Sequence, residues 1–258
     1  MMRTHYDAIY LSPHLDDAAL SCGGQIYEQT AVGHSVLIVT IMAGDPPPQG
    51  PFSAFVQELH ARWRLVENAA AARRAEDVQA CQILGAAYEH WSIPDCVYRT
   101  HPVNGRPLYP TWEDVIAAVH PAEEGLIGQL AQQIGRLPPA GQVYTPLAAG
   151  GHADHRITRA AAERRFGAKL LYYEDYPYAA ERDALTAVIP SGDPSWQWRV
   201  VPLSAASLAA KITAVAAYTS QVSTFFAGQA DLEQKITAYT APGGGERVWQ
   251  RRVGSGVV

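Results

Sequence analysis

The sequence predicts an α/β fold: a Rossmann-like domain in which a mostly parallel sheet is flanked by helices. The first observation is the order of the N-terminal segments: an apolar run at residues 6–11, a helix pattern at 17–31, and a β-branched run at 34–43. Such a β-α-β start favours parallel strands joined by a right-handed crossover. The second observation is that strand and helix patterns alternate up to about residue 175, which is typical of α/β sheets.

The later segments continue this alternation and then become less regular. Strands are predicted over residues 88–93, 141–145 and 169–176. Helices are predicted over residues 66–84 and 121–136, from the second histidine motif to about 166, and near 205–219 and 230–239. We therefore expect a single domain over residues 1–258, with a core over about residues 6–178. An extension over about residues 179–258 is expected to cover the sheet edge and wall the site.

Size and composition are those of a globular protein with an apolar core. The chain has 258 residues, of which 48% are hydrophobic and 17% charged. Its formal net charge is −5 and no Lys/Arg stripe stands out, so nothing favours nucleic acid as a partner. No apolar run is long enough for a signal peptide or a membrane span. The three cysteines form no disulfide framework, and we expect a reducing, cytoplasmic location.

Histidines and carboxylates gather at two predicted strand-to-helix junctions, HLDD at residues 14–17 and HADH at residues 152–155. Taken alone, either junction is explained as a helix N-cap, in which a carboxylate accepts unpaired backbone N–H groups. Because both follow predicted parallel strands, both open on the same edge of the sheet, where α/β proteins bind ligands. Together they supply two imidazoles and a carboxylate, enough for an open His₂Asp metal site.

These two junctions also contain more acids and bases than a metal ion needs. Hydrolysis requires a base for the attacking water and a donor for the tetrahedral oxyanion. Adjacent residues at a turn point in different directions, so one aspartate can bind a metal while its neighbour faces the water. His152 and His155, three residues apart at a helix start, lie on one face and can serve one cavity.

At this point the sequence resembles the PIG-L/LmbE-like zinc-dependent de-N-acetylases. PHLDD followed by AALSCGG at residues 13–24, and GGHADHR at residues 150–156, are similar to the two signature motifs of that family. Its RxxE pattern on a helix ending in LG is matched by Arg73, Glu76 and the LG pair at residues 84–85. A PD pair after the third strand is matched at residues 94–95. The resemblance extends from about residue 6 to about residue 166.

The resemblance implies one zinc ion per chain, held by His14, Asp17 and His155. It implies that Asp16 is the general base that takes a proton from the attacking water. A zinc ion lowers the pKa of its water toward about 7, so a nearby carboxylate can complete the deprotonation.

Further roles follow from the same resemblance. His152 is expected, as imidazolium, to stabilise the tetrahedral oxyanion or to protonate the leaving amine, and Asp154 to orient or electrostatically support His152. Arg73 and Asp95 resemble substrate-contacting positions. From the residues alone other interpretations stay open: Arg73 and Glu76 can form a surface ion pair, and Asp95 can merely shape a turn after the preceding proline.

In one position the sequence departs from the family pattern. Some members carry a tyrosine two residues before the first histidine of the second motif, thought to assist the oxyanion, and here that position is Gly150. Either this helper is missing or another residue, from within residues 173–178, replaces it. The segment YYEDYPY at residues 172–178 has two interpretations. It is either a sugar-facing wall in which Glu174 or Asp175 binds hydroxyls, or a strand and turn with packed tyrosines.

The predicted function is a metal-dependent hydrolase that removes the N-acetyl group from an amino sugar, such as an N-acetylglucosamine-type glycoside or glycoconjugate. One alternative is the same machinery on a different N-acyl amide, non-acetyl or non-sugar. Another is a non-catalytic metal- or sugar-binding module, which would not need the second carboxylate of Asp16. A nucleotide-binding enzyme is disfavoured because no Gly-rich loop follows the first strand and the HLDD carboxylates would repel a phosphate. The sequence identifies neither the sugar, nor the native metal, nor the oligomeric state, and a homo-oligomer remains open.

Overall fold

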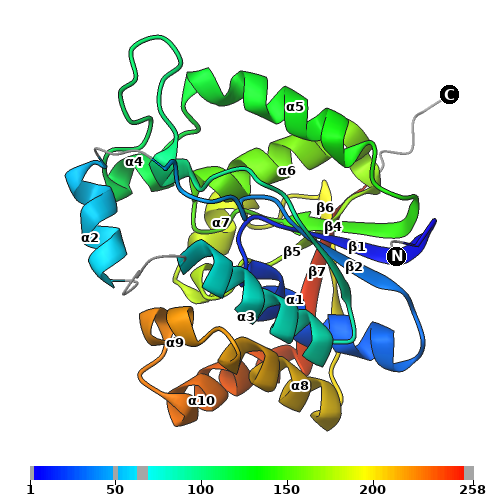
Figure 1. Ribbon diagram of the computed structural model, residues 1–258. Helices are drawn as coiled ribbons and strands as arrows, with labels where there is room; N and C mark the ends of the chain where they lie inside the picture. Colours follow the sequence, from blue (N-terminus) through cyan, green and yellow to red (C-terminus); the bar gives the residue numbers. More distant parts are fainter. Residues whose placement is uncertain (1–2, 49–51, 63–68, 253–258) are drawn as a thin grey trace, which may run out of the picture.

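A computed structural model describes residues 3–48, 52–62 and 69–252 (Figure 1). In this described part of the chain, seven strands form one sheet in the order β3-β2-β1-β4-β5-β7-β6. The strands are β1 (Tyr6–Ser12), β2 (Val36–Thr40), β3 (Ala87–His90), β4 (Ala140–Pro146), β5 (Leu171–Tyr173), β6 (Trp196–Pro202) and β7 (Gly245–Arg251). The pairings among β1 to β5 are parallel, whereas β7 pairs antiparallel with both β5 and β6. The α/β class and the mostly parallel sheet are therefore confirmed.

The strand order reverses beside β1. From β1 the chain adds β2 and then β3 on one side, and β4 then pairs with the other side of β1. In doubly wound sheets, such a reversal leaves a crevice at the carboxyl ends of the two central strands, and ligands bind there. The two histidine motifs follow β1 and β4, so both lie at this crevice.

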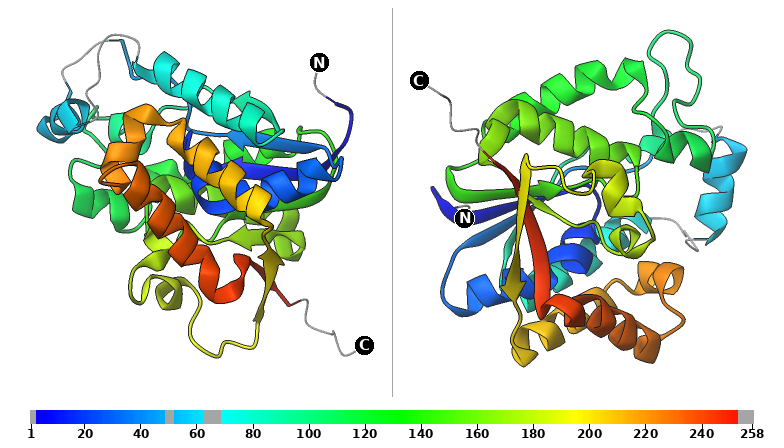
Figure 2. Two further views of the ribbon diagram at one scale, coloured as in Figure 1. Left: turned by 90° about the horizontal axis from the view of Figure 1, so that it is seen from below. Right: turned by 180° about the vertical axis from the view of Figure 1, so that it is seen from behind.

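Helices cover both faces of the sheet (Figures 1 and 2). One face carries α1 (Asp17–Ala31), α3 (Ala69–Ile83), α8 (Ala205–Ala216) and α10 (Gln229–Thr240), and the other carries α5 (Glu124–Ile134) and α6 (Ala153–Phe166). Strand β1 serves both cores because successive side chains of a strand point to opposite faces. Ala8 and Tyr10 pack in the cluster beneath α1, and Ile9 and Leu11 pack in the cluster beneath α6.

The C-terminal third extends the sheet as well as covering it. The sequence patterns predict helices in this region but do not predict β7. Its sequence, GERVWQR, has polar residues on both faces and so lacks a strand-like alternation. A buried carboxylate fixes this region: Glu246 on β7 accepts from the backbone N–H groups of Gly24 (3.0 Å) and Gln25 (2.8 Å) and from Lys211 Nζ on α8 (2.7 Å). These hydrogen bonds therefore hold the C-terminal extension against α1, the helix that begins at the crevice.

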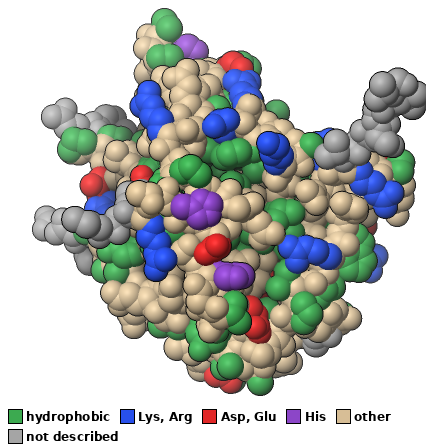
Figure 3. All heavy atoms as spheres, turned by 90° about the vertical axis from the view of Figure 1, so that its right-hand side faces the viewer, with side chains coloured by type: hydrophobic (Ala, Val, Ile, Leu, Met, Phe, Trp, Pro, Cys, Tyr) green, Lys and Arg blue, Asp and Glu red, His purple; other side chains and the backbone are tan. Residues whose placement is uncertain are grey.

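The sequence did not predict four short helices: α2 (Ala54–Arg62), α4 (Trp112–Ile116), α7 (Ala184–Val188) and α9 (Thr219–Phe225). Residues of α2, α4 and α9 line the cavity at the crevice, whereas α7 packs against the core. Parts of two predicted segments, residues 49–51 of a loop and 66–68 of a helix, lie outside the described residues. No helix within the described ranges is both long and apolar enough to cross a membrane. On the face shown in Figure 3, Lys and Arg side chains stand apart from one another and form no continuous basic strip.

Candidate metal and catalytic site

The first junction is shaped by Ser12, the last residue of β1. Its hydroxyl donates to the carbonyl of His14 (2.7 Å) and accepts from the backbone N–H of Ala18 (3.1 Å), in the first turn of α1. Asp16 occupies the N-cap position but makes no side-chain capping bond. Asp17 accepts from the backbone N–H of His14 (2.8 Å). The N-cap interpretation therefore does not account for Asp16, because Ser12 already caps the helix.

At the second junction the cap is a histidine. His152 is the N-cap of α6, and its Nδ1 accepts from the backbone N–H of Asp154 at 3.2 Å. A nitrogen that accepts a hydrogen bond carries no proton, so the neutral ring has its proton on Nε2. Burial is the main cause that lowers the pKa of His152, to about 3. Gly151 precedes it with φ of 76°, and a Cβ there would lie 2.8 Å from the carbonyl oxygen of Ile116.

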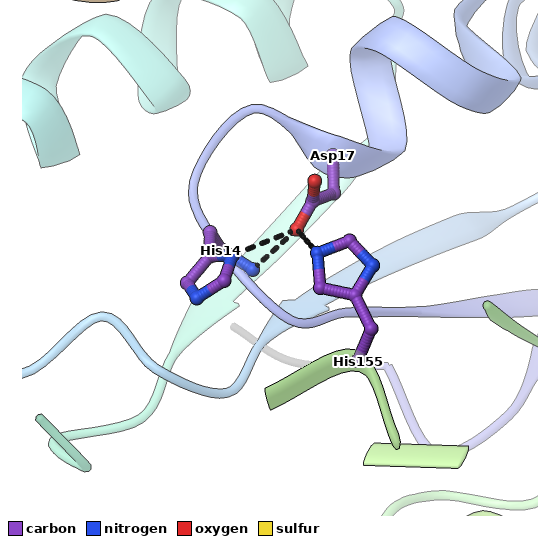
Figure 4. Close-up of side chains that lie close together, drawn as sticks. All are labelled: His14, Asp17 and His155. Carbon is purple, nitrogen blue, oxygen red and sulfur yellow. Dashed lines mark hydrogen bonds and ion pairs between the residues drawn. The ribbon is translucent and has the colours of Figure 1, made fainter. Parts of the chain in front are cut away.

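The two junctions bring His14, Asp17 and His155 together (Figure 4). Oxygen Oδ2 of Asp17 lies 3.2 Å from His14 Nδ1 and 3.2 Å from His155 Nε2, so the carboxylate points between the two rings. The three groups each offer a ligand atom, and these atoms lie within 4.8 Å of one another. Two imidazoles and a carboxylate form the ligand set of open zinc sites. These residues therefore fit a divalent cation.

The far nitrogens of both histidines are held by carboxylates. His155 Nδ1 lies 2.6 Å from Asp175 Oδ1, and His14 Nε2 lies 3.1 Å from Asp154 Oδ2. Such partners fix the tautomer and the orientation of metal-binding histidines, so that the near nitrogen is free to bind. The arrangement gives each predicted histidine ligand the support that a metal site needs.

Without a cation, His14 and His155 hold their protons tightly, whereas Asp17 is ionised. Burial alone would lower the pKa of His155, but Asp17 and Asp175 raise it to about 10. For His14, hydrogen bonds to Asp154 and Asp17 likewise outweigh burial and raise the pKa well above its usual value. Burial opposes ionisation of Asp17, yet His155 and His14 hold the pKa of this carboxyl well below its usual range. A cation would therefore take the place of protons on the histidines.

Asp154 is anchored from behind. Its carboxylate accepts from Arg99 Nη2 (2.6 Å) and from the backbone N–H of Cys96 (2.9 Å), and Arg99 also pairs with Glu123 (2.6 Å). The carboxylate of Asp154 thus orients His14, and its charge also acts on His152 by opposing the fall in that residue's pKa. The expected electrostatic support of His152 stays a prediction. The contact with His14 was not expected, because sequence spacing does not reveal which side chain lies across the crevice.

Asp16 has a different environment from its neighbour Asp17. It is 7% exposed and lines the cavity above the histidines. Burial, and then the nearby charge of Asp17, raise the pKa of Asp16 to about 6, although Arg73 opposes the shift. A buried carboxylate that titrates near neutral pH suits a general base.

An open cavity leads to these residues. Both predicted substrate contacts, Arg73 and Asp95, line it. Asp95 shapes the turn that follows Pro94, since Oδ1 accepts from the backbone N–H of Val97 (3.1 Å), and its Oδ2 lies 3.6 Å from His14 Nε2. Its contact with substrate stays a prediction. The other walls come from separate elements: Leu59 on α2, Trp112 on α4, Tyr178 after β5, and Gln221, Thr224 and Phe225 on α9.

The residues of the segment 172–178 have different roles, some in packing and some at the site. Tyr173 donates to the carbonyl of Leu11 (2.9 Å), and Glu174 pairs with Arg247, so the packing interpretation holds for both. Asp175 orients His155, and Tyr178 lines the cavity. Sequence reasoning missed Asp175 as a partner of His155, although its place just after a strand at the same edge of the sheet was a usable signal.

A family model described as PIG-L, GlcNAc-PI de-N-acetylase, matches residues 9–166. The chain belongs to this family. The matched PIG-L region contains both histidine motifs and every predicted site residue, and it ends with α6.

Relatives support this assignment. The chain is 28% identical to a 2'-N-acetylparomamine deacetylase of Streptomyces fradiae over 181 residues, which cover 69% of this chain and 59% of that protein. The crystal structure of a zinc-inhibited form of the teicoplanin deacetylase Orf2 matches with a TM-score of 0.77 and 29% identity, over 96% of this chain and 99% of that one. An A40926 pseudoaglycone deacetylase, Dbv21, matches with a TM-score of 0.70 and 26% identity, over 95% and 96%.

Proposed function

We propose that this protein is a zinc-dependent hydrolase that removes the acetyl group from the nitrogen of an amino sugar, on an N-acetylglucosamine-type glycoside or glycoconjugate. The observation that carries the proposal is the division between two adjacent aspartates. Asp17 faces two histidines whose far nitrogens are held by carboxylates, while Asp16 lines the cavity with a pKa near 6. A module that only binds metal or sugar would not need the second carboxylate.

His14, Asp17 and His155 would hold the cation, with Asp154 and Asp175 orienting the histidines. A bound divalent cation supplies Lewis acidity, which polarises the acyl carbonyl and lowers the pKa of water. Zinc is favoured by the nitrogen and carboxylate donors.

The protein's own residues would then move the protons. Asp16 takes a proton from the attacking water as the new C–O bond makes the amide carbon tetrahedral. The sequence expectation was an imidazolium at His152, but burial lowers the pKa of this ring to about 3 and its Nδ1 accepts a hydrogen bond. We therefore propose that His152 acts as a neutral ring that donates a hydrogen bond from Nε2 to the oxyanion. When the C–N bond breaks, the amine takes up the proton that Asp16 accepted, and the products are acetate and a free amine.

The choice of an amino sugar is supported by the family and by the cavity. The family description names an N-acetylglucosamine conjugate, and the Streptomyces fradiae relative is named for an N-acetylated paromamine. Arg73 and Asp95 line the cavity and would bind sugar hydroxyls, and Trp112, which is 42% exposed, would offer an apolar face to a sugar ring. The loops over residues 44–51 and 98–110 are proposed to set the aglycone.

The test is a panel of N-acetylated, N-propionylated and N-butyrylated amino sugars and simple amines, assayed for free amine after zinc loading. We expect the N-acetyl sugars to react fastest. Asp16→Asn should keep about one equivalent of metal and lose on the order of 10²–10⁴-fold in kcat. Equal activity of Asp16→Asn and wild type would contradict the mechanism, and preference for a non-sugar or longer acyl amide would contradict the substrate class.

A further inference from the structure

Tyr178 stands apart from the other tyrosines near the site. It begins the 3-10 turn Tyr178–Ala180, after β5, and lines the same cavity as Asp16 and His152. Its ring meets that of His155 edge-on, with centroids 6.1 Å apart and an interplanar angle of 87°. The ring is therefore held directly beside the proposed metal ligands.

A glycine makes room for this ring. A Cβ added at Gly150 would lie 2.6 Å from Cγ, 2.8 Å from Cβ and 2.9 Å from Cδ1 of Tyr178. Real Cβ atoms do not approach other atoms so closely, so any side chain at position 150 would displace the tyrosine. Gly150 and Tyr178 thus pack directly against each other. Because Gly150 in the loop before α6 has no side chain, the ring of Tyr178 from the loop after β5 occupies that space.

The hydroxyl of Tyr178 has no partner among the residues that the structure describes. Its neighbours differ: Tyr172 donates to Glu163 (3.0 Å), Tyr173 to the carbonyl of Leu11 (2.9 Å), and Tyr239 to Glu174 (2.6 Å). The Tyr178 side chain is half-buried and faces this cavity. A tyrosine hydroxyl that lines a cavity without a protein partner is a donor available to a ligand.

We propose that Tyr178 is a catalytic residue whose hydroxyl donates a hydrogen bond to the acyl oxygen of the substrate as that oxygen becomes an oxyanion. The inference rests on the proposed amide hydrolysis. No proton is transferred in this contact: Tyr178 O–H stays intact, and its dipole stabilises the negative charge that forms when the carbonyl carbon is attacked. With His152 Nε2–H, it gives the oxyanion two protein donors from two different loops.

Tyr178→Phe tests the assignment, because it removes only the hydroxyl and keeps the ring against Gly150. Loss of one oxyanion donor lowers kcat by about 10²–10³-fold. We expect that loss, with KM within about twofold of wild type and unchanged metal content. Tyr172→Phe is the matched control, since it removes a hydroxyl bonded to Glu163 on α6, and it should leave kcat unchanged.

A binding measurement separates this role from a structural one. A tetrahedral methylphosphonamidate analogue of the N-acetyl sugar should bind Tyr178→Phe about as much more weakly as kcat/KM falls, measured by calorimetry. An active wild type whose Tyr178→Phe variant keeps both kcat and analogue affinity would overturn the role of Tyr178 alone. A wild-type protein that hydrolyses no amide in the panel would overturn both proposals.

Discussion

The floor and the wall of the cavity are built in different ways. The floor, defined as His14, Asp16, Asp17 and His155, lies at the ends of central parallel strands, and both of its histidines contact carboxylates on two sides. The wall, defined as Leu59, Trp112 and the α9 residues, comes from short helices. The histidines of the floor are each held by two carboxylates, whereas the wall residues are held by the packing of short helices. The comparison indicates that the floor sets the reaction and that the wall sets the substrate.

Removing a floor ligand should have the largest effect. His155→Ala and Asp17→Ala each leave two ligands, too few for a stable site, so metal content should fall well below one equivalent. Activity should fall by at least about 10³-fold, which corresponds to roughly 4 kcal/mol of transition-state stabilisation. Metal analysis of purified protein, alongside the exposed control His34→Ala, gives the measurement. Full metal content in either variant would mean that these residues are not the ligands.

The floor could be predicted from sequence because its members share two short motifs. HLDD and HADH each place their residues within one turn after a strand, and parallel strands bring such turns to one edge. The wall could not be predicted in this way. The α9 residues reach the cavity through tertiary packing alone, and nothing in their local sequence distinguishes them from other helix residues.

The residues that hold the floor side chains in place, such as Asp175 and Arg99, could be predicted only in part. Asp175 lies near the C-terminal end of the predicted strand over residues 169–176, but its partner His155 lies 20 residues earlier in the chain, and Arg99 reaches Asp154 across 55 residues. No periodic pattern encodes such pairs. The strands β6, at the sheet edge, and β7, between β5 and β6, were missed for a related reason. Both carry polar residues on both faces and lack the alternation that identifies a half-buried strand.

Asp175→Asn should weaken the floor without removing a ligand. The new amide can donate to His155 Nδ1, which moves the ring proton to Nε2 and blocks the nitrogen that faces Asp17. Loss of such a partner typically costs about 10–100-fold in metal affinity. Competition with a metal-sensitive dye would measure the change, with Asp231→Asn on α10 as control. Unaltered affinity in Asp175→Asn would show that His155 needs no orienting carboxylate.

Acid should weaken metal binding through the same histidines. With the pKa of His155 raised to about 10 in the metal-free protein, the ring is protonated at pH 7 and must lose its proton to bind a cation. One displaced proton makes the affinity fall about tenfold for each pH unit below that value. Calorimetry in buffers of different ionisation enthalpy should detect at least one proton released per metal at pH 7.

The metal-free protein should respond to pH in the opposite direction. Because the folded-state pKa of His155 is raised above its unfolded value of about 6.5, its stabilising effect is complete below pH 6.5 and is lost as pH rises toward 10. Denaturant unfolding of the metal-free protein at several pH values gives this part of the profile. Release of no proton on metal binding would contradict the interpretation of both profiles.

The smallest effect is expected from loosening the wall. Glu76 on α3 holds the start of α9: its carboxylate accepts from Thr219 Oγ1 (2.6 Å), from the Ser220 backbone N–H (2.9 Å) and from Ser220 Oγ (2.6 Å). Through these bonds the RxxE glutamate positions a helix whose other side chains line the cavity. Glu76→Gln replaces one acceptor oxygen with a donor and removes the charge that strengthens these bonds.

We expect Glu76→Gln to raise KM about fivefold, equivalent to roughly 1 kcal/mol, and to increase amide hydrogen exchange in α9. Metal content and kcat should change by less than about twofold, because the bonds of Glu76 lie outside the floor. Glu163→Gln is the matched control: it also sits on a helix and accepts from a hydroxyl, that of Tyr172, but it is absent from the cavity wall. A fall in kcat and metal content at constant KM would instead mean that α9 supports the floor, and the division between reaction and substrate elements would be wrong.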